Sequence, residues 1–145
     1  RTPTPPPMTP AQIQLLRRSF ALLLPKADAT AGLFYEHLFA ADPALRALFP
    51  ADLQAQRTKL MQMIGGAVGL VDKPHVLLPM VRQLGGRHAV YGVMPAHHGA
   101  VGAALLKTLA QRLGPAFDDD TRTAWEMLYA LIAGMMLEGA ERAAA

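Results

Sequence analysis

The chain has 145 residues and no cysteine, which excludes disulfide bonds, cysteine-based zinc sites and thiol catalysis. It also has no apolar run long enough to cross a bilayer, since the longest one covers only residues 127–137. Charged residues make up 17% of the chain, the net charge is +3, and Lys and Arg are scattered rather than gathered in a stripe. We therefore expect neither a membrane protein nor a nucleic-acid-binding one. Because no charged and apolar leader opens the sequence, we expect a cytoplasmic location.

The composition that remains is typical of a globular protein with a large core. Apolar residues account for 52% of the chain, and the length suits one domain. Residues 1–8 are rich in proline, so we predict a disordered lead-in there and a single domain over residues 9–145.

Helical spacing of apolar residues, together with helix start and stop signals, predicts an all-α fold without strands. Thr9 and Gln12 form a capping-box pattern at the first helix, which Pro25 ends. Asp28 and Asp52 are predicted to cap the helices that follow them. Further helices are predicted from Pro and Gly positions over residues 43–49, 74–88 and 95–113, and from residue 118 onwards.

One histidine, His88, lies on the apolar face of the predicted helix that also carries Leu84. On its own such a histidine is usually a core or boundary residue. Two further signals accompany it, Phe39-x-x-x-Pro43 with Phe49 six residues later, and Tyr91-Gly92-Val93 just downstream. Together the three signals are far more specific than any one of them.

From about residue 9 to residue 138 the chain resembles the globin family, and within it the bacterial group of flavohaemoglobin globin domains and the stand-alone Hell's Gate globin. The segments that carry the resemblance are Leu33-Phe34-Tyr35, Leu38-Phe39-x-x-x-Pro43, Lys59-Leu60-Met61-Gln62, Arg87-His88-x-x-Tyr91-Gly92-Val93, and Ala124-Trp125 with Tyr129.

The resemblance implies a globin fold, a helical sandwich that encloses b-type haem (iron protoporphyrin IX). It implies that His88 ligates the iron and that Phe49 packs flat on the haem. It places Tyr35, Gln56 and Leu60 in the distal wall, where a gas molecule binds. Since the chain has no cysteine, the haem would be held non-covalently.

Other residues are expected to support this site. A neutral imidazole is a strong ligand for ferrous haem, and its second ring nitrogen needs an acceptor, for which the carbonyl of Leu84 is a candidate. Lys59 and Arg87 are candidates to pair with the haem propionates, although such residues are solvated charges by default. Val93 and Val101 are expected to contact the haem.

Two hydrogen-bond donors, Tyr35 and Gln56, predict tight binding of O2. The leading hypothesis is therefore a globin that binds O2, NO or other diatomic ligands and that converts NO to nitrate with electrons from an external reductase. A gas storage or sensing protein without catalysis is the alternative. A helical module without haem is a third class, which a colourless purified protein would indicate.

Overall fold

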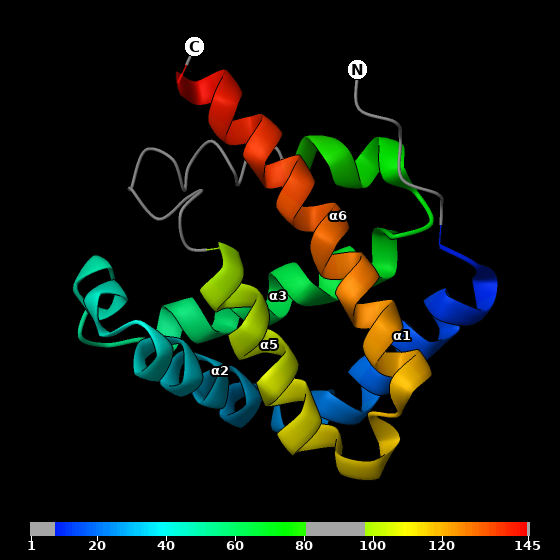
Figure 1. Cartoon of the computed structure of the whole chain (residues 1–145), viewed down its shortest axis with the longest axis horizontal. Coiled ribbons are helices and arrows are strands. Elements are labelled where there is room, and N and C mark those ends of the chain that lie inside the picture. The colour runs from blue at the N-terminus through cyan, green and yellow to red at the C-terminus, as the bar shows by residue number, and fades with distance from the viewer. Residues whose placement is uncertain (1–7, 81–97, 145) are drawn as a thin grey trace.

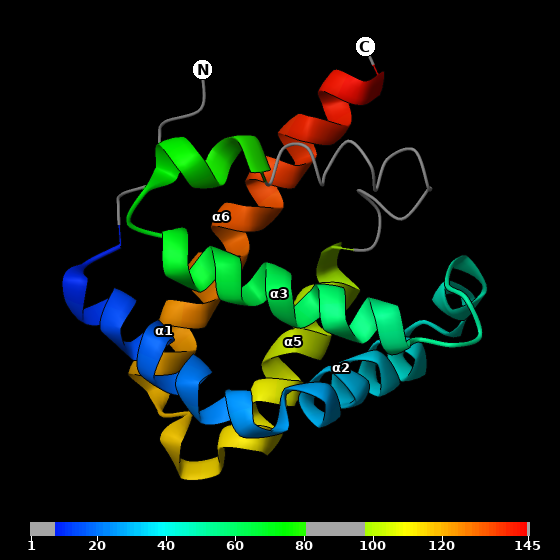
Figure 2. The same cartoon turned by 180° about the vertical axis from the view of Figure 1, so that it is seen from behind.

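The computed structural model describes residues 8–80 and 98–144, which are largely helical and contain no strand (Figures 1 and 2). The predicted all-α class is thus confirmed. The main helices are α1 (Pro10–Leu23), α2 (Ala27–Ala41), α3 (Gln54–Leu70), α5 (His98–Leu113) and α6 (Asp119–Ala144). Short 3₁₀ turns connect several of them, namely η1 (Leu24–Lys26), η2 (Pro43–Leu48) and η3 (Gly114–Ala116), and residues 74–80 form a further helical segment.

The first helix begins as the sequence predicts. The Thr9 amide donates to Gln12 Oε1 at 2.9 Å, and the Gln12 amide donates to Thr9 Oγ1 at 3.2 Å, which is a complete capping box. Met8, which we assigned to the lead-in, packs against the core beside this cap.

Two predicted caps were wrong. Helix α2 begins one residue before Asp28, and its N-cap residue, Lys26, makes no side-chain cap bond. Helix α3 has Leu53 as its N-cap, again without a side-chain cap bond. Asp52 instead accepts a bond at 3.0 Å from the amide of Gln54, two residues further on, and the carboxylate of Asp28 contacts α3. Both aspartates thus satisfy donors at the start of α3, although neither occupies a cap position.

Helix α3 lies on the opposite side of the molecule from α5 and α6 (Figures 1 and 2). Helix α2 packs against both α3 and α5, while α1 packs mainly against α6. The chain therefore forms two connected regions, one around α1 and α6 and one around α2. Within the described ranges, no helix combines the length and the apolar character that a membrane crossing requires.

The first core cluster joins α1, α3, α5 and α6 around the single tryptophan, Trp125, which is 1% exposed. The indole N–H of Trp125 donates to Ser19 Oγ at 2.9 Å across the α1–α6 contact. The Ser19 hydroxyl contacts the carbonyl of Leu15 at 2.7 Å, one turn earlier on its own helix. The buried polar groups at the centre of this cluster are thus satisfied, as burial requires.

Helices α5 and α6 approach each other closely at Gly102. A Cβ atom at this position would lie 2.7 Å from a ring carbon of Tyr129, which is closer than real Cβ contacts come. The Tyr129 ring therefore rests directly on the backbone of α5, and a larger residue at Gly102 would push the two helices apart.

The second core cluster is formed by α2, η2 and α5. Its fully buried members are Phe34, Tyr35, Leu38, Leu45 and Ala104. Leu105 of α5 packs against both clusters, so the two cores are continuous through this helix. The second cluster contains the aromatic residues that the sequence singled out, and it positions the site described below.

We predict that Ser19→Ala lowers the free energy of unfolding by about 1–3 kcal/mol, because the buried indole N–H of Trp125 loses its acceptor. Chemical denaturation followed by circular dichroism measures the change. In a Trp125→Phe background the same substitution should cost clearly less, since no indole N–H remains to be satisfied. Equal costs in the two backgrounds would contradict this role for the Trp125–Ser19 bond.

Candidate functional site

Tyr35 lies near the middle of α2 and is only 6% exposed. Its ring meets Phe34 edge-on with the ring centroids 5.1 Å apart, stacks on Phe39 at 5.8 Å and meets Phe49 edge-on at 5.7 Å. These are favourable arrangements for aromatic pairs. The phenol group is thereby held by rings from α2 itself and from the segment just after η2.

The hydroxyl of Tyr35 is hydrogen-bonded to the side chain of Gln56 on α3. Burial raises the pKa of Tyr35 to about 12, and the bond to Gln56 acts in the opposite direction with a smaller effect. Burial disfavours the charged phenolate because it removes the ion from water. Tyr35 therefore keeps its proton at neutral pH and can donate a hydrogen bond to a small ligand beside it.

At Phe49 the chain turns, and one arginine, Arg46, binds the backbone of this turn. The guanidinium of Arg46 donates to the carbonyls of Phe49, Pro50 and Ala51 at 3.3, 2.9 and 3.0 Å. The same group lies 5.4 Å from the centroid of the Phe39 ring, within the range of a cation–π contact. Arg46 thus fixes the backbone that presents Phe49 and also packs over the ring next to it.

No sequence pattern singles out Arg46. A lone arginine in a short, otherwise apolar segment is usually interpreted as a solvated charge, and nothing in the sequence shows that three carbonyls will converge on it. Only the turn of the chain after η2 brings those carbonyls within reach of one guanidinium.

Leu60 of α3 and Val101 of α5 complete this side of the site, because both are half-buried and pack against the second core cluster together with Phe49. Five predicted residues thus belong to the second core cluster or contact a member of it, namely Tyr35, Phe49, Gln56, Leu60 and Val101. Lys59 lies next to them on α3 and is exposed. The other predicted site residues, Leu84, Arg87, His88 and Val93, lie outside the described residues.

A small apolar cavity lies behind Leu60, between α2, α3 and α5. Two threonines line it, but Thr30 Oγ1 donates to the Lys26 carbonyl at 2.9 Å and Thr108 Oγ1 to the Ala104 carbonyl at 2.7 Å. Their hydroxyl protons are therefore committed to their own helices. The remaining lining is Leu23, Ala31, Phe34, Leu60, Met61, Ile64, Leu105 and Leu109.

The chemistry of this donor set fits a flat, largely apolar cofactor with a small ligand on one side. Phe49, Leu60 and Val101 supply an apolar wall, and Tyr35 and Gln56 supply a neutral hydroxyl and an amide at the same place. The described chain is thus an all-α domain in which α2, α3 and α5 meet at a cluster of aromatic and apolar side chains, with Phe49 just after the Pro-started turn η2.

The chain belongs to the globin family. The family model described as Globin matches residues 32–136, which include α3, α5 and most of α2. The predicted globin fold and the resemblance on which it rested are both confirmed.

Among the relatives, the flavohemoprotein of Bacillus subtilis is 31% identical over 83% of this chain, and that of Bordetella parapertussis is 31% identical over 94%. The matches cover 31% and 34% of those proteins, so this chain spans about one third of their length. Neuroglobin of Danio rerio is 33% identical over 72% of this chain and 75% of its own length.

Solved structures agree with these relatives. A bacterial globin from Campylobacter jejuni superposes with a TM-score of 0.82 at 26% identity, over 92% of this chain and 97% of the other. A hexacoordinated heme protein from a tardigrade gives a TM-score of 0.84 over 93% of this chain and 96% of its own. At 15% identity, this second likeness concerns the fold alone.

Proposed function

We propose that this chain binds b-type haem in the pocket formed by α2, α3 and α5, and that it binds O2 tightly there. The observation that carries the proposal is the pair of buried Tyr35 and half-buried Gln56, a neutral phenol and an amide that meet beside the apolar side chains of Phe49, Leu60 and Val101. Membership of the globin family supports the same cofactor. When bound, haem supplies a ferrous iron that binds diatomic gases.

In this proposal, the residues of the pocket have separate tasks. His88 would hold the iron through a neutral imidazole, and the Leu84 carbonyl would accept the second ring N–H. Phe49 and Val101, with Val93, would supply apolar packing for the cofactor, and Leu60 would exclude water from the bound gas. Lys59 is exposed on α3, where a cation can reach a propionate at the pocket's edge, and Arg87 is proposed for the same task.

Tyr35 and Gln56 act on the ligand. A ligand oxygen with partial negative charge accepts a hydrogen bond from the Tyr35 hydroxyl, which keeps its proton because the pKa is raised to about 12. Each bond to a charged acceptor contributes roughly 1.5–3 kcal/mol, which slows release of O2 by about ten- to a hundredfold. A pocket with two such donors holds O2 rather than delivering it.

Held O2 suits a reaction better than transport, and we propose that the reaction is the dioxygenation of nitric oxide. NO and O2 would combine with one electron to give nitrate, and a bound ferrous haem would supply that electron. Repeated turnover then requires an electron donor, either a separate reductase or a segment outside this sequence. One of the structural neighbours supports this reaction, an engineered carbene transferase from Rhodothermus marinus whose parent protein is described as a candidate nitric oxide dioxygenase (TM-score 0.80, 25% identity).

We predict that His88→Ala abolishes stable haem binding, because the pocket then offers no strong axial ligand at that position. Titration with hemin, followed through the Soret band, measures binding. His75→Ala is the matched control, since His75 is exposed near the start of the helical segment 74–80. Full retention with an unchanged spectrum in His88→Ala would remove His88 from the ligand role. A wild-type protein that takes up no hemin would overturn the proposed function as a whole.

We predict that Tyr35→Phe raises the O2 dissociation rate constant at least tenfold, because the ligand loses a hydrogen bond. Stopped-flow displacement of O2 by CO measures this rate constant. Tyr129→Phe is the control, since Tyr129 is another tyrosine whose pKa burial raises to about 12, but it packs on Gly102 of α5. The wild-type rate should show no tyrosine titration between about pH 6 and pH 9, because Tyr35 loses its proton only near pH 12. An unchanged rate constant in Tyr35→Phe would exclude Tyr35 as a donor.

We predict that the oxygenated protein consumes NO within the mixing time of a stopped-flow instrument and yields ferric protein and nitrate in equal amounts. Absorbance spectra follow the haem, and ion chromatography quantifies nitrate. Slow O2 release together with rapid NO consumption supports dioxygenation. Fast O2 release with little nitrate would instead indicate gas storage or sensing without catalysis.

A further inference from the structure

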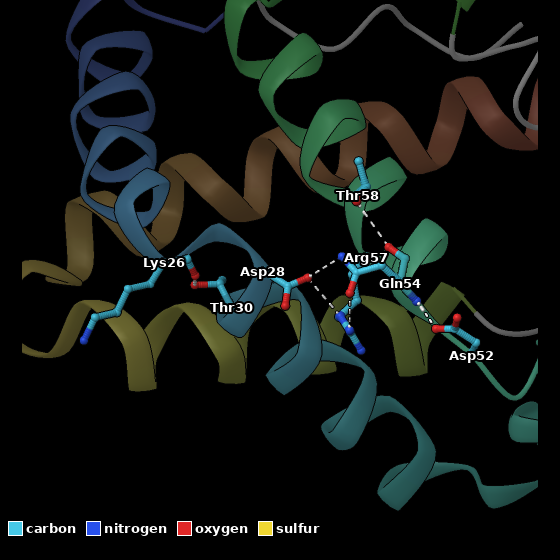
Figure 3. A network of polar contacts seen from close by, with 7 residues as sticks. All are labelled: Lys26, Asp28, Thr30, Asp52, Gln54, Arg57 and Thr58. Carbon is cyan, nitrogen blue, oxygen red and sulfur yellow. Dashed lines mark hydrogen bonds and ion pairs between the residues drawn. The ribbon is translucent and has the colours of Figure 1, made fainter.

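A small polar network ties the first turn of α3 to the first turn of α2 (Figure 3). Arg57 Nε donates to Asp28 Oδ1 at 3.0 Å, and Gln54 Nε2 donates to the same oxygen at 3.3 Å. Arg57 Nη2 in turn donates to Gln54 Oε1 at 2.8 Å. The three side chains thus form a closed triangle of hydrogen bonds, which restrains each of them more than one ion pair would.

This triangle lies where the N-cap residue of neither helix makes a side-chain cap bond. The N-cap residues of α2 and α3, Lys26 and Leu53, make no side-chain cap bonds. Asp28 is the acidic residue in the first turn of α2, where a carboxylate suits the helix dipole, and it also binds two donors from the first turn of α3. The Asp28 carboxylate therefore links the first turn of α2 to the first turn of α3.

The network is connected to the pocket through the facing surfaces of the two helices. Asp28, Gly32 and Tyr35 follow one another along α2 at the four- and three-residue spacing that places side chains on one helix face. Arg57 extends across Gly32, because its Cδ lies 3.6 Å from where a Cβ of that glycine would be. Gln56 directly precedes Arg57 in the chain and binds Tyr35.

We propose that Asp28 and Arg57 are positioning residues, which hold the first turn of α3 in the register that brings the Gln56 amide to the Tyr35 hydroxyl. The bond between Gln56 and Tyr35 then sets how firmly a ligand is held in the pocket. This consequence for ligand release rests on the function proposed above, whereas the consequence for the position of α3 does not.

Because Asp28 and Arg57 are partly exposed, a change in the position of α3 can be told apart from a change in the free energy of folding. The Asp28 side chain is 62% exposed and that of Arg57 26% exposed, and ion pairs in such surroundings add little to the free energy of folding. Removal of Asp28 should therefore leave the folded state largely intact while it loosens the start of α3. An Asp28 variant can therefore report on the position of α3 while the protein stays folded.

The other end of α3 provides a matched control. Arg17 of α1 donates to the carbonyls of Val68 at 3.4 Å and Gly69 at 3.1 Å, and to Asp72 Oδ1 at 3.1 Å. This is also a partly exposed arginine–aspartate pair that holds an end of α3, but it lies at the end remote from Gln56. Asp72→Ala therefore removes the same kind of interaction without loosening the first turn.

The first test is a double-mutant cycle on the haem-loaded protein, with O2 dissociation as the readout. Asp28→Ala should raise the rate constant at least threefold, though no further than Gln56→Leu does, and Asp28→Asn, which keeps an acceptor oxygen, should have a smaller effect. In the Gln56→Leu background, Asp28→Ala should change nothing, because no amide remains to be positioned. Asp72→Ala should resemble the wild type. An unchanged rate in Asp28→Ala, or an equal increase in both backgrounds, would overturn the positioning role.

The second test is hydrogen exchange, measured with and without added hemin. Asp28→Ala should speed exchange of the amides in residues 54–60 and leave residues 66–70 unchanged, whereas Asp72→Ala should do the reverse. Unaltered exchange in residues 54–60 of Asp28→Ala would show that the network does not hold α3. If no variant binds hemin, the proposed function fails, and the exchange pattern still decides whether Asp28 and Arg57 fix the start of the helix.

Discussion

The bond between Tyr35 and Gln56 is the interaction on which the site depends. It joins α2 to α3 beside apolar side chains, and the half-buried Gln56 amide gives the buried Tyr35 hydroxyl a polar partner. Aromatic rings hold the Tyr35 ring, and their packing leaves its hydroxyl directed toward α3. Because burial raises the pKa of Tyr35 to about 12, the site presents a proton rather than a charge. A neutral donor in an apolar pocket is well suited to a small, weakly polar ligand.

The two core clusters stabilise different helix contacts. The first cluster, around Trp125, fastens α1 to α6 and contains a fully satisfied polar bridge to Ser19. The second cluster, around Tyr35, is formed by α2, η2 and α5, and several of its members are only half-buried. Leu105 of α5 packs against both clusters, so this helix connects them.

Arginines hold the segments that carry site residues, and this pattern could not be foreseen. Arg46 gathers the carbonyls that follow Phe49, Arg57 links the starts of α2 and α3, and Arg17 holds the far end of α3. Each is a polar residue on a helical face, which sequence patterns assign to solvent. Asp28 illustrates the same difficulty, since the sequence rule for aspartate before a helix predicts a cap, whereas the residue bonds with another helix. The competing interaction is tertiary, and local rules cannot include it.

The sequence by itself determined the helical class, most helix boundaries and the family of the chain. Those features depend on residue spacing, on Pro and Gly, and on caps such as Thr9 with Gln12, all of which act within a few residues of one another. It also singled out Tyr35, Phe49, Gln56, Leu60 and Val101 through resemblance, whereas His88 remains a prediction. Only the tertiary structure decided that these five converge, that the Tyr35 hydroxyl meets Gln56, and that Asp28 and Arg46 hold backbone and helices in place. Such contacts join residues far apart in the chain, and they arise only when the helices pack.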